Sequence, residues 1–135
     1  MPPVSKKQSS PDKHTKILVV EDDRAYAHVF ERKLAMENFE VKVSNGADNI
    51  SDLVASFKPD LMILDLVLPG KSGFDIIEEV RSGPQGKMII IIIASNLSQD
   101  SDRDKAMAAG ANDYFIKSNI SVNEMVDRVK KAVHN

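Results

Sequence analysis

Residues 61–70 of the chain are Leu-Met-Ile-Leu-Asp-Leu-Val-Leu-Pro-Gly, an apolar run with one carboxylate near its middle and a Pro-Gly turn behind it. The four apolar residues before Asp65 predict a strand buried on both faces, as in a parallel sheet covered by helices. Asp65 would then lie where this strand ends, at the sheet edge where ligands bind in such folds. A lone aspartate at this position is more often a loop cap than a ligand-facing group. The rest of the chain has to decide between the two interpretations.

The composition is that of a soluble protein with one domain. The chain has 135 residues, of which 42% are hydrophobic and 28% charged, enough to bury a real core. It contains no cysteine, which excludes disulfides, thiolate metal sites and thiol nucleophiles. Its longest strictly apolar run, residues 88–94, is far too short to cross a membrane, and its N-terminus lacks the apolar segment of a secretory signal. We therefore expect a cytoplasmic protein without membrane insertion.

Charge is distributed unevenly along the chain. Residues 1–16 hold four lysines against one aspartate, a local charge of +3, whereas the remainder holds 14 basic and 19 acidic residues, a charge of −5. An acidic body argues against binding to nucleic acid. The first 14 residues also contain three prolines and three serines. We expect residues 1–14 to form a disordered basic tail and residues 15–135 to form the folded domain.

Five apolar strand candidates alternate with amphipathic helical segments. The strands are expected at residues 17–20, 41–43, 61–64, 88–93 and 114–116. Residues 88–93 include five consecutive isoleucines and should form a fully buried strand. Residues 98–109 offer little apolar surface, so their helix should be loosely attached to the core. The last helix has a clearer start, a capping box formed by Ser121 and Glu124.

The alternation of strands and helices predicts an α/β fold with a parallel sheet and helices on both faces. Five strands are too few for a closed eight-stranded barrel, so an open, doubly wound sheet remains. We expect five parallel strands in the order 2-1-3-4-5 with five helices, which is the flavodoxin-like arrangement. In this order strands 1 and 3 flank the point at which the winding reverses, and ligands bind there.

This topology brings polar residues from four strand ends to one edge of the sheet. Glu21 and Asp22 follow strand 1 and would lie beside Asp65. Three carboxylates so close together would not all ionise without a cation, and their oxygens suit Mg²⁺. Ser95 ends strand 4 and Lys117 ends strand 5, which adds a hydroxyl and an ammonium. Together these groups would accommodate a phosphoryl group, and one carboxylate could attack phosphorus.

Each of these residues also has an ordinary structural explanation. The acidic cluster could serve only the dipole of the helix that follows it. A serine after a strand is commonly a turn or cap residue, and a lone lysine is commonly a surface residue. The joint placement of all of them at the ends of strands 1, 3, 4 and 5 favours a functional site.

The chain resembles the receiver domain of the bacterial two-component response regulators over residues 16–134. The residues that carry the resemblance are Val19-Val20-Glu21-Asp22-Asp23, Asp65 with Leu68-Pro69-Gly70 and Gly73, Ala94-Ser95, and Tyr114-Phe115-Ile116-Lys117. The spacings agree as well, with 30 residues from Asp65 to Ser95 and 22 from Ser95 to Lys117. No single motif is diagnostic, but the ordered set is highly specific.

The resemblance implies a phosphorylation switch that assists its own phosphorylation and dephosphorylation, and not an enzyme. Asp65 would be the phosphoacceptor, and the phosphoryl group would come from a phosphohistidine of a sensor histidine kinase or a phosphotransfer protein. The cofactor would be Mg²⁺, with four protein ligands: Glu21, Asp22, Asp65 and the backbone carbonyl of Val67.

The resemblance also implies how the phosphoryl group would be sensed. Ser95 and Lys117 would contact the aspartyl-phosphate. Ser95 would move toward it and Tyr114 would turn inward, which would change the surface formed by the fourth helix, the fifth strand and the fifth helix. That surface would bind a downstream protein. The chain itself would be a monomer or a weak dimer that depends on phosphorylation.

Three positions depart from the family pattern. Ser118 follows Lys117, where the family usually has a proline in a cis peptide. A cis bond before a residue other than proline costs roughly 3–4 kcal/mol, so we expect a trans linkage or a strained one. Val67 and Leu97 are apolar at positions that flank the path of the hydrolytic water and are often polar in the family. We hypothesise that they hinder that water and prolong the life of the phosphoryl group.

The favoured interpretation is a stand-alone response regulator that passes its signal to another protein, since no output domain follows residue 135. The alternative is a small Mg²⁺-dependent phosphatase of the haloacid-dehalogenase type, which also uses a nucleophilic aspartate. Such enzymes normally need an aspartate at the position of Val67 and carry a cap insertion for which this chain has no room. A degenerate receiver that only binds partners is a third interpretation, weakened because every acidic and hydroxyl position is filled.

Overall fold

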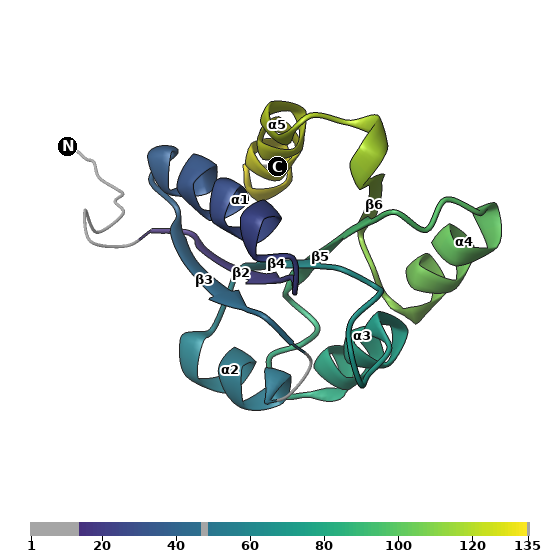
Figure 1. Ribbon diagram of the computed structural model, residues 1–135. Helices are drawn as coiled ribbons and strands as arrows, with labels where there is room; N and C mark the ends of the chain where they lie inside the picture. The colour runs from purple at the N-terminus through teal and green to yellow at the C-terminus, as the bar shows by residue number, and fades with distance from the viewer. Residues whose placement is uncertain (1–13, 47–48, 135) are drawn as a thin grey trace.

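Strands and helices alternate along the chain, as the sequence predicts (Figure 1). The computed structural model describes residues 14–46 and 49–134, so residues 1–13 of the predicted tail lie outside the described residues. The strands are β2 (Lys16–Val20), β3 (Glu40–Ser44), β4 (Leu61–Leu64), β5 (Ile90–Ser95) and β6 (Asp113–Ile116). The helices are α1 (Arg24–Met36), α2 (Ile50–Phe57), α3 (Gly73–Ser82), α4 (Asp100–Ala109) and α5 (Val122–Val133), with a 3₁₀ turn at Lys117–Asn119 before α5.

The sheet has five parallel strands in the order β3-β2-β4-β5-β6. This is the predicted 2-1-3-4-5 order, and it confirms the doubly wound, flavodoxin-like arrangement. From β2 the chain moves to β3 at one edge of the sheet. It then returns to β4, on the other side of β2, and continues through β5 to β6 at the opposite edge. The winding therefore reverses between β2 and β4, at the place where ligands bind in open α/β sheets.

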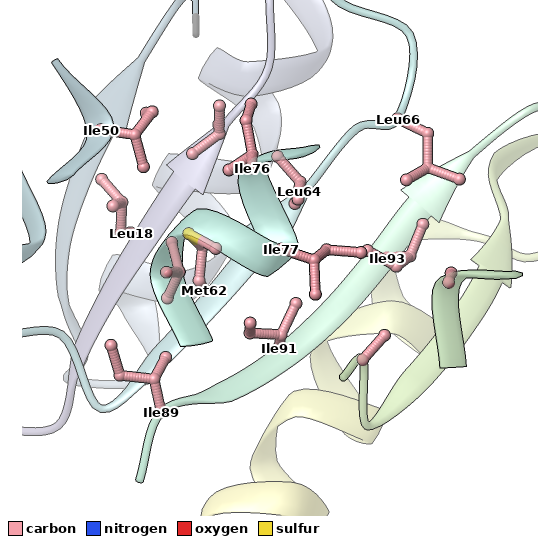
Figure 2. Packing of buried hydrophobic residues seen from close by; sticks show 14 of the residues in the cluster. Leu18, Ile50, Met62, Leu64, Leu66, Ile76, Ile77, Ile89, Ile91 and Ile93 are labelled. Carbon is pink, nitrogen blue, oxygen red and sulfur yellow. The ribbon is translucent and has the colours of Figure 1, made fainter. Parts of the chain in front are cut away.

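Helices cover both faces of the sheet, α1 and α5 on one side and α2, α3 and α4 on the other (Figure 1). Successive residues of β4 point to opposite faces, as the pleat of a strand requires. Met62 and Leu64 belong to the cluster under α2, α3 and α4 (Figure 2), whereas Leu61 and Ile63 belong to the cluster under α1 and α5. All four are buried, which explains the unbroken apolar run before Asp65.

The boundaries of the isoleucine-rich strand differ from the prediction. β5 begins at Ile90 and not at residue 88, and the side chain of Met88 is 86% exposed. The reason lies in the neighbouring strand, because β4 begins at Leu61 and Leu61 is paired with Ile90. Residues before Ile90 have no strand beside them to pair with. Hydrophobicity alone therefore places the start of β5 two residues too early.

Helix α4 is loosely attached to the core, as its sequence predicts. Of its ten residues, Ala106 is the buried one. The C-terminal end of α4 is held from outside by Arg81, the next-to-last residue of α3. The guanidinium of Arg81 donates to Gly110 O at 2.6 and 3.0 Å and to Ile89 O at 2.6 Å. It also donates to Asn112 Oδ1 at 2.8 Å. Arg81 thus joins the end of α4 to the start of β5.

Helix α3 begins in close contact with the end of β4. The N–H of Gly73 donates to Leu66 O at 3.0 Å, and a Cβ placed on Gly73 would lie 2.5 Å from Leu66 Cα and 2.9 Å from Asp65 O. Such distances are too short for any residue other than glycine unless the backbone moves. Gly73 therefore fixes the loop that carries Asp65 against α3.

We expect Gly73→Ala to destabilise the fold by about 1–3 kcal/mol, because the new methyl group must displace the backbone at Leu66. Urea unfolding followed by circular dichroism measures this change. The matched control is Gly46→Ala, since a Cβ on Gly46 meets nothing within 4 Å and should change stability by no more than about 0.5 kcal/mol. Equal effects of the two substitutions would contradict the close-packing argument.

Candidate functional site

The carboxyl ends of the central strands lie level with one another. Val20 of β2 is paired with Leu64 of β4, and Leu64 with Ile93 of β5. The residues that follow these paired positions therefore emerge at one edge of the sheet. Ser95, the last residue of β5, is paired with Ile116 of β6, which places the residue after β6 at the same edge.

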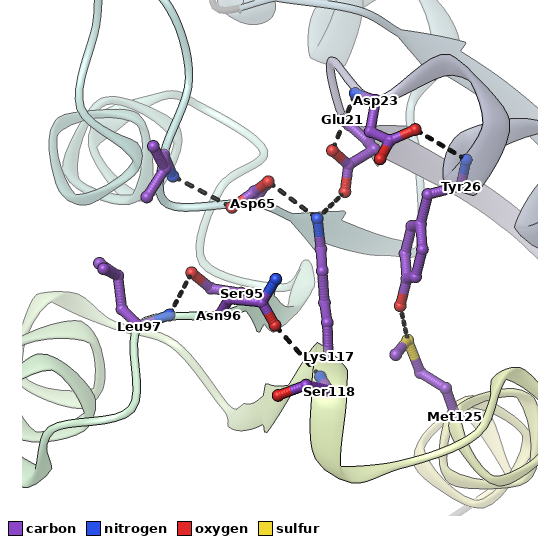
Figure 3. A network of polar contacts seen from close by, with 11 residues as sticks. Glu21, Asp23, Tyr26, Asp65, Ser95, Asn96, Leu97, Lys117, Ser118 and Met125 are labelled. Carbon is purple, nitrogen blue, oxygen red and sulfur yellow. Dashed lines mark hydrogen bonds and ion pairs between the residues drawn. The ribbon is translucent and has the colours of Figure 1, made fainter.

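All the predicted site side chains of the strand ends meet at this edge (Figure 3). Glu21 is 4% exposed, Asp65 is 8% exposed and Ser95 is fully buried. Lys117 reaches the two carboxylates from the end of β6, donating from Nζ to Glu21 Oε1 and, at 2.9 Å, to Asp65 Oδ2. Asp22 is exposed, so the acidic cluster is open to solvent on one side.

Burial and pairing shift the titration of this group of charges. The pKa of Glu21 is raised above its ordinary value, mainly because the carboxyl group is buried. Hydrogen bonds from Lys117 and from the Asp23 N–H act in the opposite direction but do not cancel this effect. Burial alone would lower the pKa of Lys117, but its hydrogen bonds to Glu21 and Asp65 outweigh that effect and raise the pKa. The lysine therefore remains an ammonium at neutral pH and offsets the carboxylates beside it.

The donor set fits a hard divalent cation. Carboxylate oxygens of Glu21, Asp22 and Asp65 all lie within 4.8 Å of one another. Oxygen ligands of this kind, open to water on one side, are those that Mg²⁺ uses. Val67 lies at the rim of the cluster, and its N–H donates to Asp65 Oδ1 at 3.1 Å. The role expected for the Val67 carbonyl stays a prediction.

Ser95 and Tyr114 are both linked to Leu97, in the segment that precedes α4. Ser95 Oγ accepts a hydrogen bond from the Leu97 N–H at 3.2 Å, and the Tyr114 hydroxyl donates to Leu97 O at 2.7 Å. The Tyr114 side chain is 5% exposed, and burial is the main cause that raises its pKa, so the hydroxyl keeps its proton as a donor. The two predicted switch residues thus hold the N-terminal approach to α4.

The linkage after Lys117 is trans, one of the two outcomes expected for Ser118, and no cis peptide occurs in residues 14–46 or 49–134. Lys117 begins the 3₁₀ turn, and the Ser118 N–H donates to Asn96 Oδ1 at 3.1 Å. A proline at position 118 would have no N–H to donate. The departure from the family pattern is therefore accompanied by a hydrogen bond that fixes the backbone behind the lysine.

Sequence reasoning missed two residues that contact this site. Asn96 bonds to Ser118, and the ring of Tyr26 has Lys117 Nζ 4.6 Å from its centroid. Tyr26 lies in the first turn of α1. The pattern of apolar residues along this helix does not reveal a contact with Lys117, which is 91 residues further along the chain. The unusual Ser118 was the one available signal that the surroundings of Lys117 differ from the family pattern.

The sequence model of the response regulator receiver domain family matches residues 17–130. The chain belongs to this family. Its members are phosphoacceptor switches of two-component signalling, not classical enzymes, and they interact with a histidine kinase or a phosphotransfer protein. They bind Mg²⁺ at an acidic pocket, which corresponds here to the cluster of Glu21, Asp22 and Asp65.

One curated relative is the phosphate regulon transcriptional regulatory protein PhoB of Rhizobium meliloti strain 1021, which is 36% identical over 115 residues. The alignment covers 85% of this chain and 50% of the relative, so the chain spans about half the length of that protein. That the chain acts alone and does not bind nucleic acid therefore stays a prediction. In the described residues, no helix is long and apolar enough to cross a membrane.

Solved structures show the same relationship. The BeF3-activated N-terminal receiver domain of Klebsiella pneumoniae RstA is 30% identical, with a TM-score of 0.77, covering 85% of this chain and 95% of that one. A response regulator signal receiver domain from Bermanella marisrubri is 28% identical, with a TM-score of 0.79, covering 90% of this chain and 99% of that one. The chain is thus related to receiver domains in both sequence and fold. The family found is not that of the haloacid-dehalogenase phosphatases considered as the alternative.

We expect Tyr114→Phe to loosen the approach to α4, because the hydrogen bond to Leu97 O is lost. One such bond contributes about 1 kcal/mol, so amide exchange in α4 should accelerate roughly fivefold. Hydrogen–deuterium exchange read by mass spectrometry measures this. Tyr26→Phe, which alters the other tyrosine of the chain, is the control and should leave α4 exchange unchanged. Unaltered exchange of α4 in Tyr114→Phe would show that the hydroxyl does not hold this segment.

Proposed function

We propose that the chain is a response regulator switch that accepts a phosphoryl group on Asp65 in a Mg²⁺-dependent reaction. The donor is a phosphohistidine of a sensor histidine kinase or of a phosphotransfer protein. The observation that carries the proposal is the environment of Asp65. Its buried carboxylate has Lys117 Nζ 2.9 Å from Oδ2, and oxygens of Glu21 and Asp22 lie within 4.8 Å of its own.

The reaction is a transfer between two nucleophiles. A carboxylate oxygen of Asp65 attacks phosphorus, the phosphorus–nitrogen bond of the phosphohistidine breaks, and the imidazole nitrogen keeps the bonding electrons and takes up a proton. Negative charge on the phosphoryl oxygens is met by the Lys117 ammonium, and the Ser95 hydroxyl offers a further hydrogen bond. Glu21, Asp22, Asp65 and the carbonyl of Val67 would hold a Mg²⁺ ion, which would supply further positive charge to offset the phosphoryl oxygens.

The response passes to α4. Ser95 and Tyr114 both bond to Leu97, so a shift of the Ser95 hydroxyl toward a phosphoryl group disturbs the same segment that Tyr114 holds. Because α4 is weakly anchored, it is the element most easily displaced by such a shift. We infer that the altered α4–β6–α5 surface binds a downstream protein, with at most weak, phosphorylation-dependent dimerisation. The transcriptional regulatory role named for the Rhizobium relative is a property of a longer protein, of which the alignment with this chain covers 50%.

Incubation of the protein with acetyl phosphate and Mg²⁺ tests the transfer of a phosphoryl group to Asp65. The intact mass of the protein is the readout. We expect one adduct of about 80 Da, the mass of a phosphoryl group, which is lost in Asp65→Asn and when EDTA removes the metal. The control Asp60→Asn makes the same change just before β4, at the opposite edge of the sheet, and should keep the adduct.

Other outcomes separate the other functions. Phosphate release in many turnovers without an adduct would support a phosphatase. No reaction with acetyl phosphate or with a phosphohistidine donor would support a degenerate receiver that only binds partners. An adduct that persists in Asp65→Asn would place the phosphoryl group elsewhere.

The lifetime of the phosphoryl group is a second proposal. The N–H of the 58% exposed Val67 bonds to Asp65, and the N–H of Leu97 bonds to Ser95, so the backbones of both apolar residues adjoin the site. We infer that their side chains hinder the hydrolytic water. We expect the double variant Val67→Asn, Leu97→Glu to lose its phosphoryl group roughly tenfold faster, a change of about 1.4 kcal/mol in activation free energy.

Decay of the mass adduct after removal of acetyl phosphate gives this rate. Val29→Asn, at an exposed valine on α1 (44% exposed), is the matched control and should decay like the unaltered protein. Decay in the double variant that is equal to, or slower than, that of the unaltered protein would refute the proposal.

A further inference from the structure

We propose that the aromatic ring of Tyr26 positions Lys117 for phosphoryl transfer, a role that rests on the function proposed above. Lys117 Nζ lies 4.6 Å from the centroid of the Tyr26 ring while it also bonds to Glu21 and Asp65 (Figure 3). An ammonium at this distance from an aromatic face is attracted to its π electrons. The ring therefore supplies a third favourable contact for the same charge.

A lysine in this place needs such support. Its ammonium is a compact charge at the end of a flexible four-carbon stem, and it adapts readily to different partners. The side chain of Lys117 is only 11% exposed, so the ring and the carboxylates replace most of the water around it. The aromatic contact limits where the ammonium can lie without using any of its three N–H donors. Those donors remain available for carboxylate or phosphoryl oxygens.

The Tyr26 ring is itself held firmly. The Tyr26 and Phe30 rings pack edge to face, with 6.1 Å between ring centroids and 67° between ring planes. The Tyr26 hydroxyl donates weakly to Met125 Sδ at 3.5 Å. Phe30 and Met125 are both buried in the core between α1, α5 and the sheet. At the backbone, the Tyr26 N–H donates to the N-cap Asp23 Oδ1 at 3.1 Å. A ring fixed by a helix start, a core aromatic and a second helix can serve as a rigid surface for the lysine.

The backbone of the lysine is fixed from the other end. Ser118 N–H donates to Asn96 Oδ1, one residue beyond the buried Ser95. Asn96 thus restrains the chain that carries Lys117, and Tyr26 restrains the charged tip. This arrangement explains how a trans linkage before Ser118 still delivers the ammonium to Asp65.

Two substitutions separate this role from simple packing. Tyr26→Phe keeps the aromatic face and loses only the hydroxyl contact with Met125. Tyr26→Leu keeps an apolar side chain and loses the aromatic face. If the ring positions the lysine, Phe should preserve function and Leu should not. If Tyr26 only fills space, the two variants should not differ in the way the lysine behaves.

The first measurement is made without phosphorylation. In ¹³C-lysine-labelled protein, the Lys117 Hε resonance, assigned with Lys117→Arg, should be shifted upfield by the ring current in the unaltered protein and in Tyr26→Phe. It should return toward the ordinary lysine position in Tyr26→Leu. An ordinary Lys117 shift in the unaltered protein would overturn the proposal, whether or not Tyr26→Leu folds.

The second measurement is the rate of phosphorylation by acetyl phosphate with Mg²⁺. We expect the maximal rate constant to fall roughly fivefold in Tyr26→Leu, in line with the loss of one ring–ammonium contact, and to stay within about twofold in Tyr26→Phe. A rate in Tyr26→Leu equal to that of the unaltered protein, or an equal loss in both variants, would overturn the positioning role. Failure of the unaltered protein to react would instead refute the proposed function, because the lysine resonance is measured independently of it.

Discussion

The ammonium of Lys117 between the carboxylates of Glu21 and Asp65 is the interaction on which the site depends. Two acidic groups with 4% and 8% exposure would not both be ionised side by side without a nearby positive charge. The three residues come from the ends of β2, β4 and β6, so the pairing also requires the sheet to keep those strands level. The core clusters on both faces give the sheet that precision. The buried apolar run before Asp65 thus helps to hold the charged groups at the strand ends in contact.

The packing around this edge is unequal. On the side of α3, Gly73 brings the start of the helix so close to the loop after β4 that even a Cβ at this position would clash with the backbone of Leu66. On the side of α4, a single buried alanine and two hydrogen bonds to Leu97 hold the approach to the helix. A chemical change at Asp65 therefore meets a rigid neighbour on one side and a yielding one on the other. This difference selects the direction in which the molecule can respond.

Much of the fold and most of the site follow from the sequence, because a parallel sheet brings all its strand ends to one edge. Once the strands were placed, Glu21, Asp65, Ser95 and Lys117 had to meet there. The contacts of Lys117 with Tyr26 and of Asn96 with Ser118 could not be found this way. They depend on the rotation of α1 and on the path of the turn after β6, which no local periodicity encodes. The start of β5 differs from the prediction for a similar reason, since Met88 is apolar but lies beyond the first residue of β4, Leu61, which is paired with Ile90.

The hydrogen bonds of Arg81 to Gly110 give α4 one fixed end. A ten-residue helix is about 15 Å long, and the segment released by Ser95 or Tyr114 lies at its other end. Under the proposed function, a displacement of α4 would therefore be a rotation about the Gly110 end rather than a translation. The first turn would travel farthest and the last turn least. The protein would thereby convert a small shift beside Asp65 into a change of helix angle, and the exposed residues of the first turn, Asp100, Ser101 and Arg103, would move through the largest arc.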